Sequence, residues 1–113
     1  MHTRILALAM AVLAATSTVG QENRSSTNRS ESLKSLCQRL GLGPGAVIAD
    51  VGCGDGPDTI VFASIVGPSG TVLAQEIDVA KLKRMREAAD KRGFHQVVPI
   101  LGQSDDPRLP CDG

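Results

Sequence analysis

The sequence predicts an α/β fold built on parallel strands, and two observations carry this prediction. Short apolar runs of the length of buried strands alternate with longer stretches whose apolar residues recur at helical spacing. One of these runs leads directly into a glycine-rich loop, as in parallel sheets that bind nucleotides. Such alternation favours strands joined by right-handed helical crossovers, as in one half of a doubly wound sheet.

The predicted elements follow the order helix, strand, helix, strand, helix, strand. Gly41 is expected to end the first helix, and Asp58 and Asp78 are suitable residues to cap the second and third. The predicted strands are residues 46–51, 71–75 and 96–101, and the predicted helices are residues 32–40, 59–65 and the stretch between Asp78 and Gly93.

The N-terminus has the three-part pattern of a secretory signal peptide. Arg4 gives a basic start, residues 5–15 are apolar, and small residues follow up to Gly20. The apolar run is about eleven residues long, whereas a membrane-spanning helix needs ~20. We therefore predict cleavage after Ser17 or Gly20, in preference to an uncleaved anchor or a start codon placed too far upstream.

This interpretation divides the chain into three parts. Residues 1–20 are the signal peptide, residues 21–31 form a polar, flexible linker, and residues 32–113 form a partial domain. We expect export to the periplasm or out of the cell, with no stable membrane span after removal of the signal. If the start codon is misplaced, a cytoplasmic location is expected instead.

Composition narrows the classes of function. A chain of 113 residues permits one domain at most. Its formal net charge is +0 and aromatic residues make up 2%, which argues against nucleic-acid binding, because phosphates need a basic surface and bases stack on aromatic rings. Cys37, Cys53 and Cys111 lack the spacing of a metal site, so no metal is expected. Free or buried thiols are favoured over a disulfide between Cys37 and Cys111.

Two features indicate a site for a nucleoside. Gly52, Gly54 and Gly56 follow the first predicted strand and open a helix, where glycine permits a sharp turn and the close approach of a ligand. Glu76 ends the second predicted strand, about twenty residues beyond the loop. A carboxylate in that place binds the ribose hydroxyls of an adenine nucleoside.

The spacing of the glycines separates the classes of nucleotide site. A dinucleotide fold favours the pattern GxGxxG, and Pro57 and Thr59 stand where its last glycine or alanine belongs in the two possible frames. A lysine followed by serine or threonine does not come after the loop, which excludes a P-loop. The pattern from Asp50 to Gly56 is DxGxGxG.

Three stretches resemble the class I S-adenosylmethionine-dependent methyltransferases. Val47–Gly56 resembles their first motif, Gly67–Asp78 resembles the motif that follows, and Leu101–Pro110 resembles the loop on the adenine side. The resemblance covers roughly residues 33–113 and extends to bacterial methyltransferase-domain proteins with an export signal. It implies a Rossmann-like three-layer αβα methyltransferase fold, truncated to its first three parallel strands and their helices, in a chain that is a fragment of a longer protein.

The resemblance also implies which residues hold the methionine part of S-adenosylmethionine. The backbone of Gly52, Cys53 and Gly54 would lie along it. Gly56 would complete the loop, and Asp50 would help to organise the ammonium group.

The nucleoside part of the cofactor would meet the ends of the second and third predicted strands. By resemblance, Glu76 would bind the ribose and Ile77 would cover one face of the adenine. The backbone of Ser104 and the carboxylate of Asp105 would bind the edge of the adenine ring. Gln103 stands where an aspartate is frequent in the family and is left outside the site.

The implied function is transfer of a methyl group from S-adenosylmethionine to an acceptor that the sequence does not identify. The protein of such an enzyme mainly aligns the reactants and removes a proton from the acceptor. No catalytic base is assigned, and His95 is expected on the surface. The acceptor-binding part is expected beyond this region. The chain alone is predicted to bind the cofactor weakly or not at all, because one side of the crevice and much of the cover of the sheet are expected there too. The alternatives are a non-catalytic nucleoside-binding or interaction module and, against the spacing of the glycines, an NAD-dependent oxidoreductase.

Overall fold

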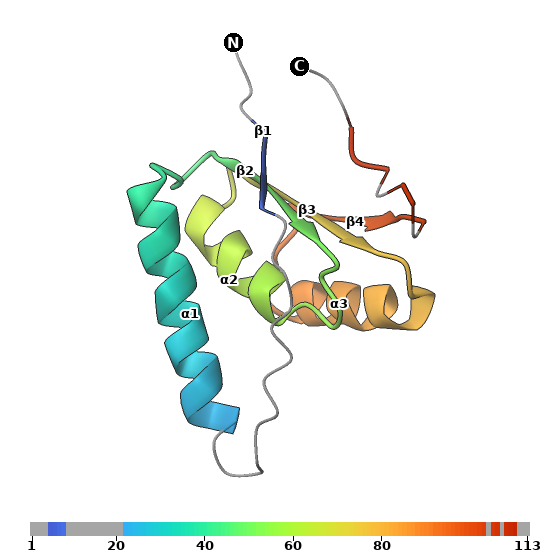
Figure 1. Cartoon of the computed structure of the whole chain (residues 1–113), viewed down its shortest axis with the longest axis horizontal. Coiled ribbons are helices and arrows are strands. Elements are labelled where there is room, and N and C mark those ends of the chain that lie inside the picture. Colours follow the sequence, from blue (N-terminus) through green and yellow to red (C-terminus); the bar gives the residue numbers. More distant parts are fainter. Residues whose placement is uncertain (1–4, 9–21, 104, 107, 111–113) are drawn as a thin grey trace.

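The computed structural model describes residues 5–8, 22–103, 105–106 and 108–110 (Figure 1). In chain order the elements are β1 (Ile5–Leu8), α1 (Glu22–Arg39), β2 (Val47–Val51), α2 (Pro57–Val66), β3 (Thr71–Glu76), α3 (Val79–Lys91) and β4 (Val97–Leu101). The three strands predicted from the sequence are β2, β3 and β4, and their bounds agree with the prediction to within one residue.

The described strands are parallel and lie in the sheet order β1-β2-β3-β4. Each strand therefore lies next to the one that follows it in the sequence. The register pairs Asp50 with Ala74 and Val51 with Gln75, so β2 and β3 end nearly level with each other. The glycine loop after β2 and the acidic end of β3 consequently meet at the same edge of the sheet.

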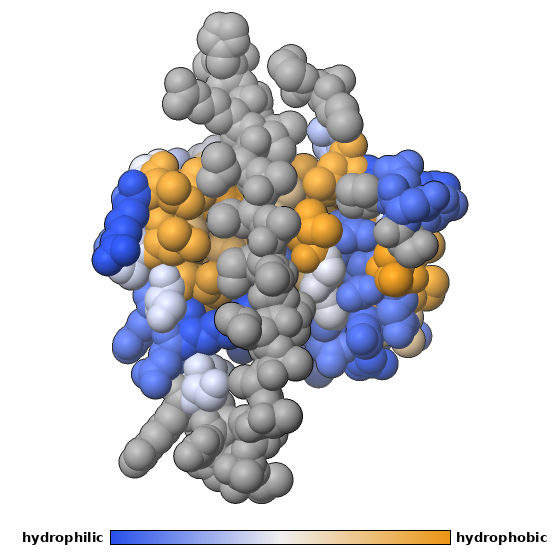
Figure 2. All heavy atoms as spheres, in the orientation of Figure 1, coloured by the Kyte–Doolittle hydropathy of each residue, from blue (hydrophilic) through white to orange (hydrophobic). Residues whose placement is uncertain are grey.

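Helices α2 and α3 cover the same face of the sheet, and α1 packs on α2. Phe62 of α2 packs with Val72, while Met85 of α3 packs with Ala74. Val72 and Ala74 share a face of β3 because side chains alternate along a strand. Figure 2 shows hydrophobic residues over the strands and α2, whereas hydrophilic residues dominate over the lower part of α1 and over α3. The larger buried cluster consists of Leu33, Cys37, Ile48, Phe62, Ala63, Val66 and Val72.

Helix α1 begins at Glu22, well before the predicted start at Ser32, so residues 22–31 are helical and not the flexible linker that was expected. The guanidinium of Arg29 forms a two-point ion pair with the carboxylate of Asp58 on α2, at 2.8 Å (Nε to Oδ1) and 2.7 Å (Nη2 to Oδ2). This pair anchors α1 one turn before Leu33, the first buried residue among those described in the helix. Once a helix is anchored, each further residue gains a backbone hydrogen bond at little cost.

Strand β1 comes from the apolar run that the sequence analysis assigned to the signal peptide. Its four residues pair with β2, with Ile5 opposite Val47 and Leu8 opposite Asp50. The two interpretations use the same property, because a short apolar run suits both a signal peptide and a buried strand. Cleavage and export stay predictions. None of the described helices is long and apolar enough to cross a membrane.

The caps of α2 and α3 differ in how well the sequence predicts them. Asp78 caps α3 as predicted, because its carboxylate accepts hydrogen bonds from the backbone N–H groups of Ala80 and Lys81. The prediction that Asp58 caps α2 is wrong. Gly56 is the capping residue, and Asp58 lies inside the first turn, where Arg29 holds its carboxylate.

Candidate functional site

The glycine loop turns the chain sharply between β2 and α2. Gly52, Gly54 and Gly56 have φ angles of 71°, 59° and 95°, a left-handed conformation that residues with a Cβ avoid. A Cβ added at Gly52 or Gly54 would meet no atom within 4 Å. The loop is therefore open at these two positions, and its backbone is accessible to a ligand.

The end of β3 holds the loop through three successive backbone N–H groups. The N–H of Gly52 donates to the side-chain Oε1 of Gln75 at 3.0 Å, and the N–H of Cys53 donates to the backbone oxygen of Gln75 at 2.8 Å. The N–H of Gly54 donates to Oε1 of Glu76 at 3.1 Å. The loop is thus fixed to the strand that also carries the predicted ribose-binding carboxylate.

Glu76 is oriented by backbone groups on both sides of it. Its Oε2 accepts hydrogen bonds from the N–H groups of Ile77 at 2.6 Å and Asp78 at 2.9 Å, while Oε1 takes the bond from Gly54. The residue is 8% exposed. A carboxylate with this many backbone donors is held in one orientation before any ligand arrives.

Asp50 lies at the end of β2 and is almost fully buried. The hydroxyl of Thr59 on α2 donates a hydrogen bond of 2.7 Å to its Oδ2. Burial raises the pKa of Asp50 from 3.8 to about 6, and the bond from Thr59 only partly opposes that rise. The carboxylate therefore lies beneath the loop and carries a negative charge once the pH exceeds its pKa of about 6.

Cys53 is a buried packing residue of the loop. Its side chain packs with Ala74 and Met85 in the smaller buried cluster. Burial raises the pKa of its thiol to about 12, so the nucleophilic thiolate is not formed near neutral pH. Its backbone N–H donates to Gln75 and its backbone oxygen accepts from Gly56, so its place along the cofactor stays a prediction. Cys37 is likewise a buried free thiol.

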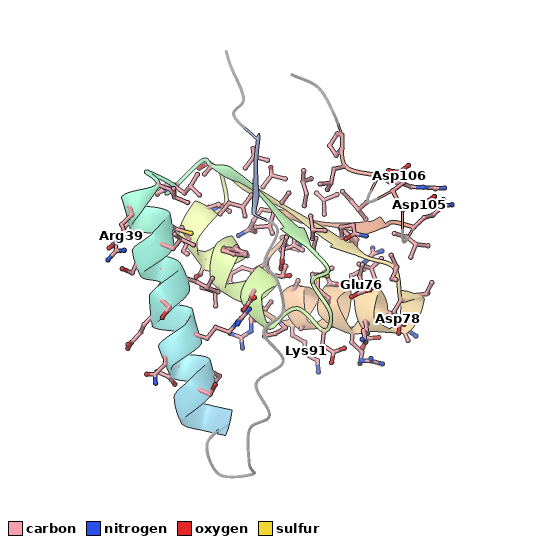
Figure 3. All side chains as sticks on the ribbon, in the orientation of Figure 1. Arg39, Glu76, Asp78, Lys91, Asp105 and Asp106 are labelled. Atoms are coloured by element: carbon pink, nitrogen blue, oxygen red, sulfur yellow. The ribbon has the colours of Figure 1, made fainter. Side chains whose placement is uncertain are left out.

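The adenine side of the predicted site is less compact. Ile77 and Leu101 are large apolar residues with exposed fractions of 54% and 47%, and Leu101 is in register with Glu76. Figure 3 shows Asp105 beyond the end of β4, on the same side of the molecule as Glu76. Asp105 is exposed in a turn, and Ser104 lies outside the described residues.

The structure thus brings seven of the nine predicted residues to the carboxyl ends of β2 and β3 or into the loop between β2 and α2. They are Asp50, Gly52, Cys53, Gly54, Gly56, Glu76 and Ile77. Sequence reasoning missed Gln75 and Thr59. The available signal for Gln75 was a polar side chain directly after three apolar residues of the strand, and Thr59 follows the glycine loop in the first turn of a helix.

Two ion pairs connect the flanking helices α1 and α3 to the end of the loop and the start of α2. Arg29 of α1 binds Asp58, and Arg84 of α3 binds Asp55 at 2.8 Å in a more exposed setting.

A cleft of about 730 Å³ opens beside Arg29 and Asp58, and of the predicted site residues only Gly56 lines it. The described residues include no group of three His, Cys, Asp or Glu side chains that could hold a metal.

We expect Gly56→Ala to lower the free energy of unfolding by about 2 kcal/mol, because a left-handed residue with a Cβ costs ~1–2 kcal/mol. The added Cβ would also lie 2.6 Å from Cγ of Met85 and force that buried side chain to move. Urea denaturation measures the loss. Gly54→Ala is the matched control, since it meets no atom within 4 Å and adds backbone strain alone. An equal loss in both variants would contradict the role of Met85.

A parallel sheet, a glycine loop at its carboxyl edge and an acidic residue at the end of the next strand define a nucleoside-binding α/β protein. Residues 42–110 match the family model described as a methyltransferase domain, which is more than half of the chain. The chain therefore belongs to the methyltransferase-domain family. This result confirms the resemblance seen in the glycine loop and in the strand that follows it.

Two curated proteins illustrate the similarity in sequence. The chain is 37% identical over 68 residues to Nocamycin O-methyltransferase of Saccharothrix syringae, an alignment that covers 60% of this chain and 24% of that protein. It is 34% identical over 71 residues to Demethylmenaquinone methyltransferase of Anoxybacillus flavithermus, covering 63% of this chain and 30% of that protein. The chain thus spans 24% and 30% of the length of these two relatives.

Solved structures show the same fold. A SAM-dependent methyltransferase from Aquifex aeolicus superposes with a TM-score of 0.63 at 24% identity, covering 69% of this chain and 42% of that one. A SAM-dependent O-methyltransferase from Thermotoga maritima superposes with a TM-score of 0.52 at 28% identity, covering 66% and 26%. The predicted Rossmann-like αβα methyltransferase fold is confirmed.

Proposed function

We propose that this chain binds S-adenosylmethionine and forms the cofactor-binding part of an enzyme that transfers its methyl group. The observation that supports this best is the orientation of Glu76. Its carboxylate is fixed by three backbone N–H groups beside an open glycine loop. A fixed carboxylate at the end of this strand suits the two vicinal hydroxyls of a ribose.

The residues present fit the cofactor in shape and charge. The open Cβ positions of Gly52 and Gly54 leave room for the methionine part along the loop. Asp50 supplies negative charge below the loop for a positively charged ammonium group, and Ile77 offers an exposed apolar surface to a flat ring. The two solved structures named above are of SAM-dependent methyltransferases, which supports the same cofactor.

When bound, S-adenosylmethionine supplies a methyl group already activated by the positive charge on sulfur. The chain's own contribution is alignment. The loop fixed to β3 sets the position of the methionine part, and Glu76 sets that of the ribose. Holding a reactant in one geometry removes much of the entropic barrier to reaction.

Thermal stability measured with separate ligands tests the proposal. The purified chain is heated with S-adenosylmethionine, S-adenosylhomocysteine, adenosine or NAD at concentrations up to millimolar. A bound ligand raises Tm in proportion to its occupancy, so the first two are expected to raise it, and NAD is not. No shift with either methionine-containing ligand, or a larger shift with NAD, would overturn the proposal.

A further inference from the structure

Two adjacent residues of β3, which point to opposite faces of the sheet, accept hydrogen bonds from the glycine loop. Side chains alternate along a strand, so Gln75 and Glu76 point to opposite faces. Glu76 shares its face with Ala74 and therefore lies on the side of the helices. Gln75 lies on the other side, yet its side-chain oxygen reaches the N–H of Gly52.

Gln75 is an unusual residue for its place. It is 4% exposed, and it follows three buried apolar residues of the same strand, Val72, Leu73 and Ala74. Burying an amide costs free energy unless it is hydrogen-bonded. The bond from Gly52 supplies that compensation and satisfies a backbone donor in a left-handed residue that has left the regular ladder.

We infer that Gln75 is a positioning residue for the cofactor loop. Its side-chain oxygen binds the N–H of Gly52, and its backbone oxygen binds the N–H of Cys53. The carboxylate of Glu76 binds the N–H of Gly54, so three successive peptide groups are fixed. By this inference Gln75 acts through the loop and not by contact with the ligand. It sets the shape of the loop along which the methionine part lies. The effect on affinity rests on the proposed function, and the effect on the loop does not.

The test compares three variants of the full chain by ¹H–¹⁵N NMR and by titration with S-adenosylhomocysteine. Gln75→Leu removes the acceptor at similar size, and Gln75→Glu retains an acceptor oxygen. Gln96→Leu is the matched control, because Gln96 also makes a partly buried side-chain bond (Nε2 to the backbone oxygen of Ala63, 3.0 Å) but does not touch the loop.

In Gln75→Leu, the amide resonance of Gly52 is expected to move upfield and its hydrogen exchange to accelerate, with affinity weakened about tenfold, the value of one ordinary hydrogen bond. Gln75→Glu is expected to keep the Gly52 resonance near its original position and to bind within about threefold of the original chain. Gln96→Leu is expected to lose stability without loss of affinity.

Each contrary result has a distinct meaning. An unchanged Gly52 resonance in Gln75→Leu overturns the hydrogen bond itself. A changed resonance with unchanged affinity overturns the positioning role. If the original chain does not bind S-adenosylhomocysteine, the proposed function fails and the positioning role with it, while the Gly52 resonance still decides whether Gln75 holds the loop. If Gln75→Leu does not fold, Gln75→Glu is the deciding variant. Loss of the hydrogen bond from Gly52 in that variant would contradict the role of the side chain at position 75 as an acceptor.

Discussion

Glu76→Gln is expected to lower the affinity for S-adenosylmethionine by at least about tenfold and the free energy of unfolding by about 2 kcal/mol. The carboxylate accepts from Gly54 through one oxygen and from Ile77 and Asp78 through the other. An amide replaces one of these oxygens by an NH₂ group, which faces a backbone donor. Because Glu76 is only 8% exposed, the orphaned donor has little access to water.

Calorimetric titration gives the affinity, and urea denaturation gives the stability. Glu87→Gln is the control, because Glu87 is an exposed carboxylate on α3 and the same change of charge is made away from the loop. We expect that control to match the original chain in both measurements. A Glu76→Gln variant of unchanged stability would show that the three backbone bonds do not depend on the charge of the carboxylate.

Asp50 is expected to make the folded chain less stable as the pH rises from 4 to 7. Its pKa is about 6 in the folded chain against an ordinary value of 3.8. The folded state therefore binds the proton more tightly than the unfolded state. Its contribution is fully present below pH 3.8 and is lost as the pH rises through 6. The difference corresponds to about 3 kcal/mol.

Asp50→Asn removes this titration and keeps an oxygen that can accept the hydrogen bond from Thr59. The difference in stability between the variant and the original chain should thus grow by about 2 kcal/mol between pH 4 and pH 7, because Asp50 is already partly ionised in the unfolded chain at pH 4. Urea denaturation at a series of pH values measures it. Asp90→Asn, an exposed change on α3, controls for the loss of one acidic residue. If the free energy of unfolding changes with pH in the same way in Asp50→Asn and in the original chain, the raised pKa does not belong to Asp50.

The strands and the loop could be predicted from the sequence because their signals are local. An apolar run bounded by glycine predicts β2 and β3 to within one residue, and Asp78 is an effective cap wherever a helix follows it. The glycine spacing and the position of Glu76 were sufficient to predict the family. None of these signals requires knowledge of which strands are neighbours.

The contacts of Gln75, Thr59 and Arg29 could not be predicted because they depend on how elements pack. Gln75 reaches Gly52 only because β2 and β3 pair with Val51 opposite Gln75. Arg29 can pair with Asp58 only because α1 packs against α2, and that pairing stabilises the N-terminal part of α1. The polar composition of residues 22–31 resembles that of a linker, and a tertiary ion pair overrides it.

Strand β1 has a consequence for access to the loop. In open α/β sheets, ligands bind where the strand order reverses, because crossovers that leave in opposite directions open a crevice there. The described strands run from β1 to β4 without a reversal, and β1 lies along the edge of β2 with Leu8 opposite Asp50. If residues 1–20 are cleaved as the sequence predicts, that edge is uncovered at Asp50.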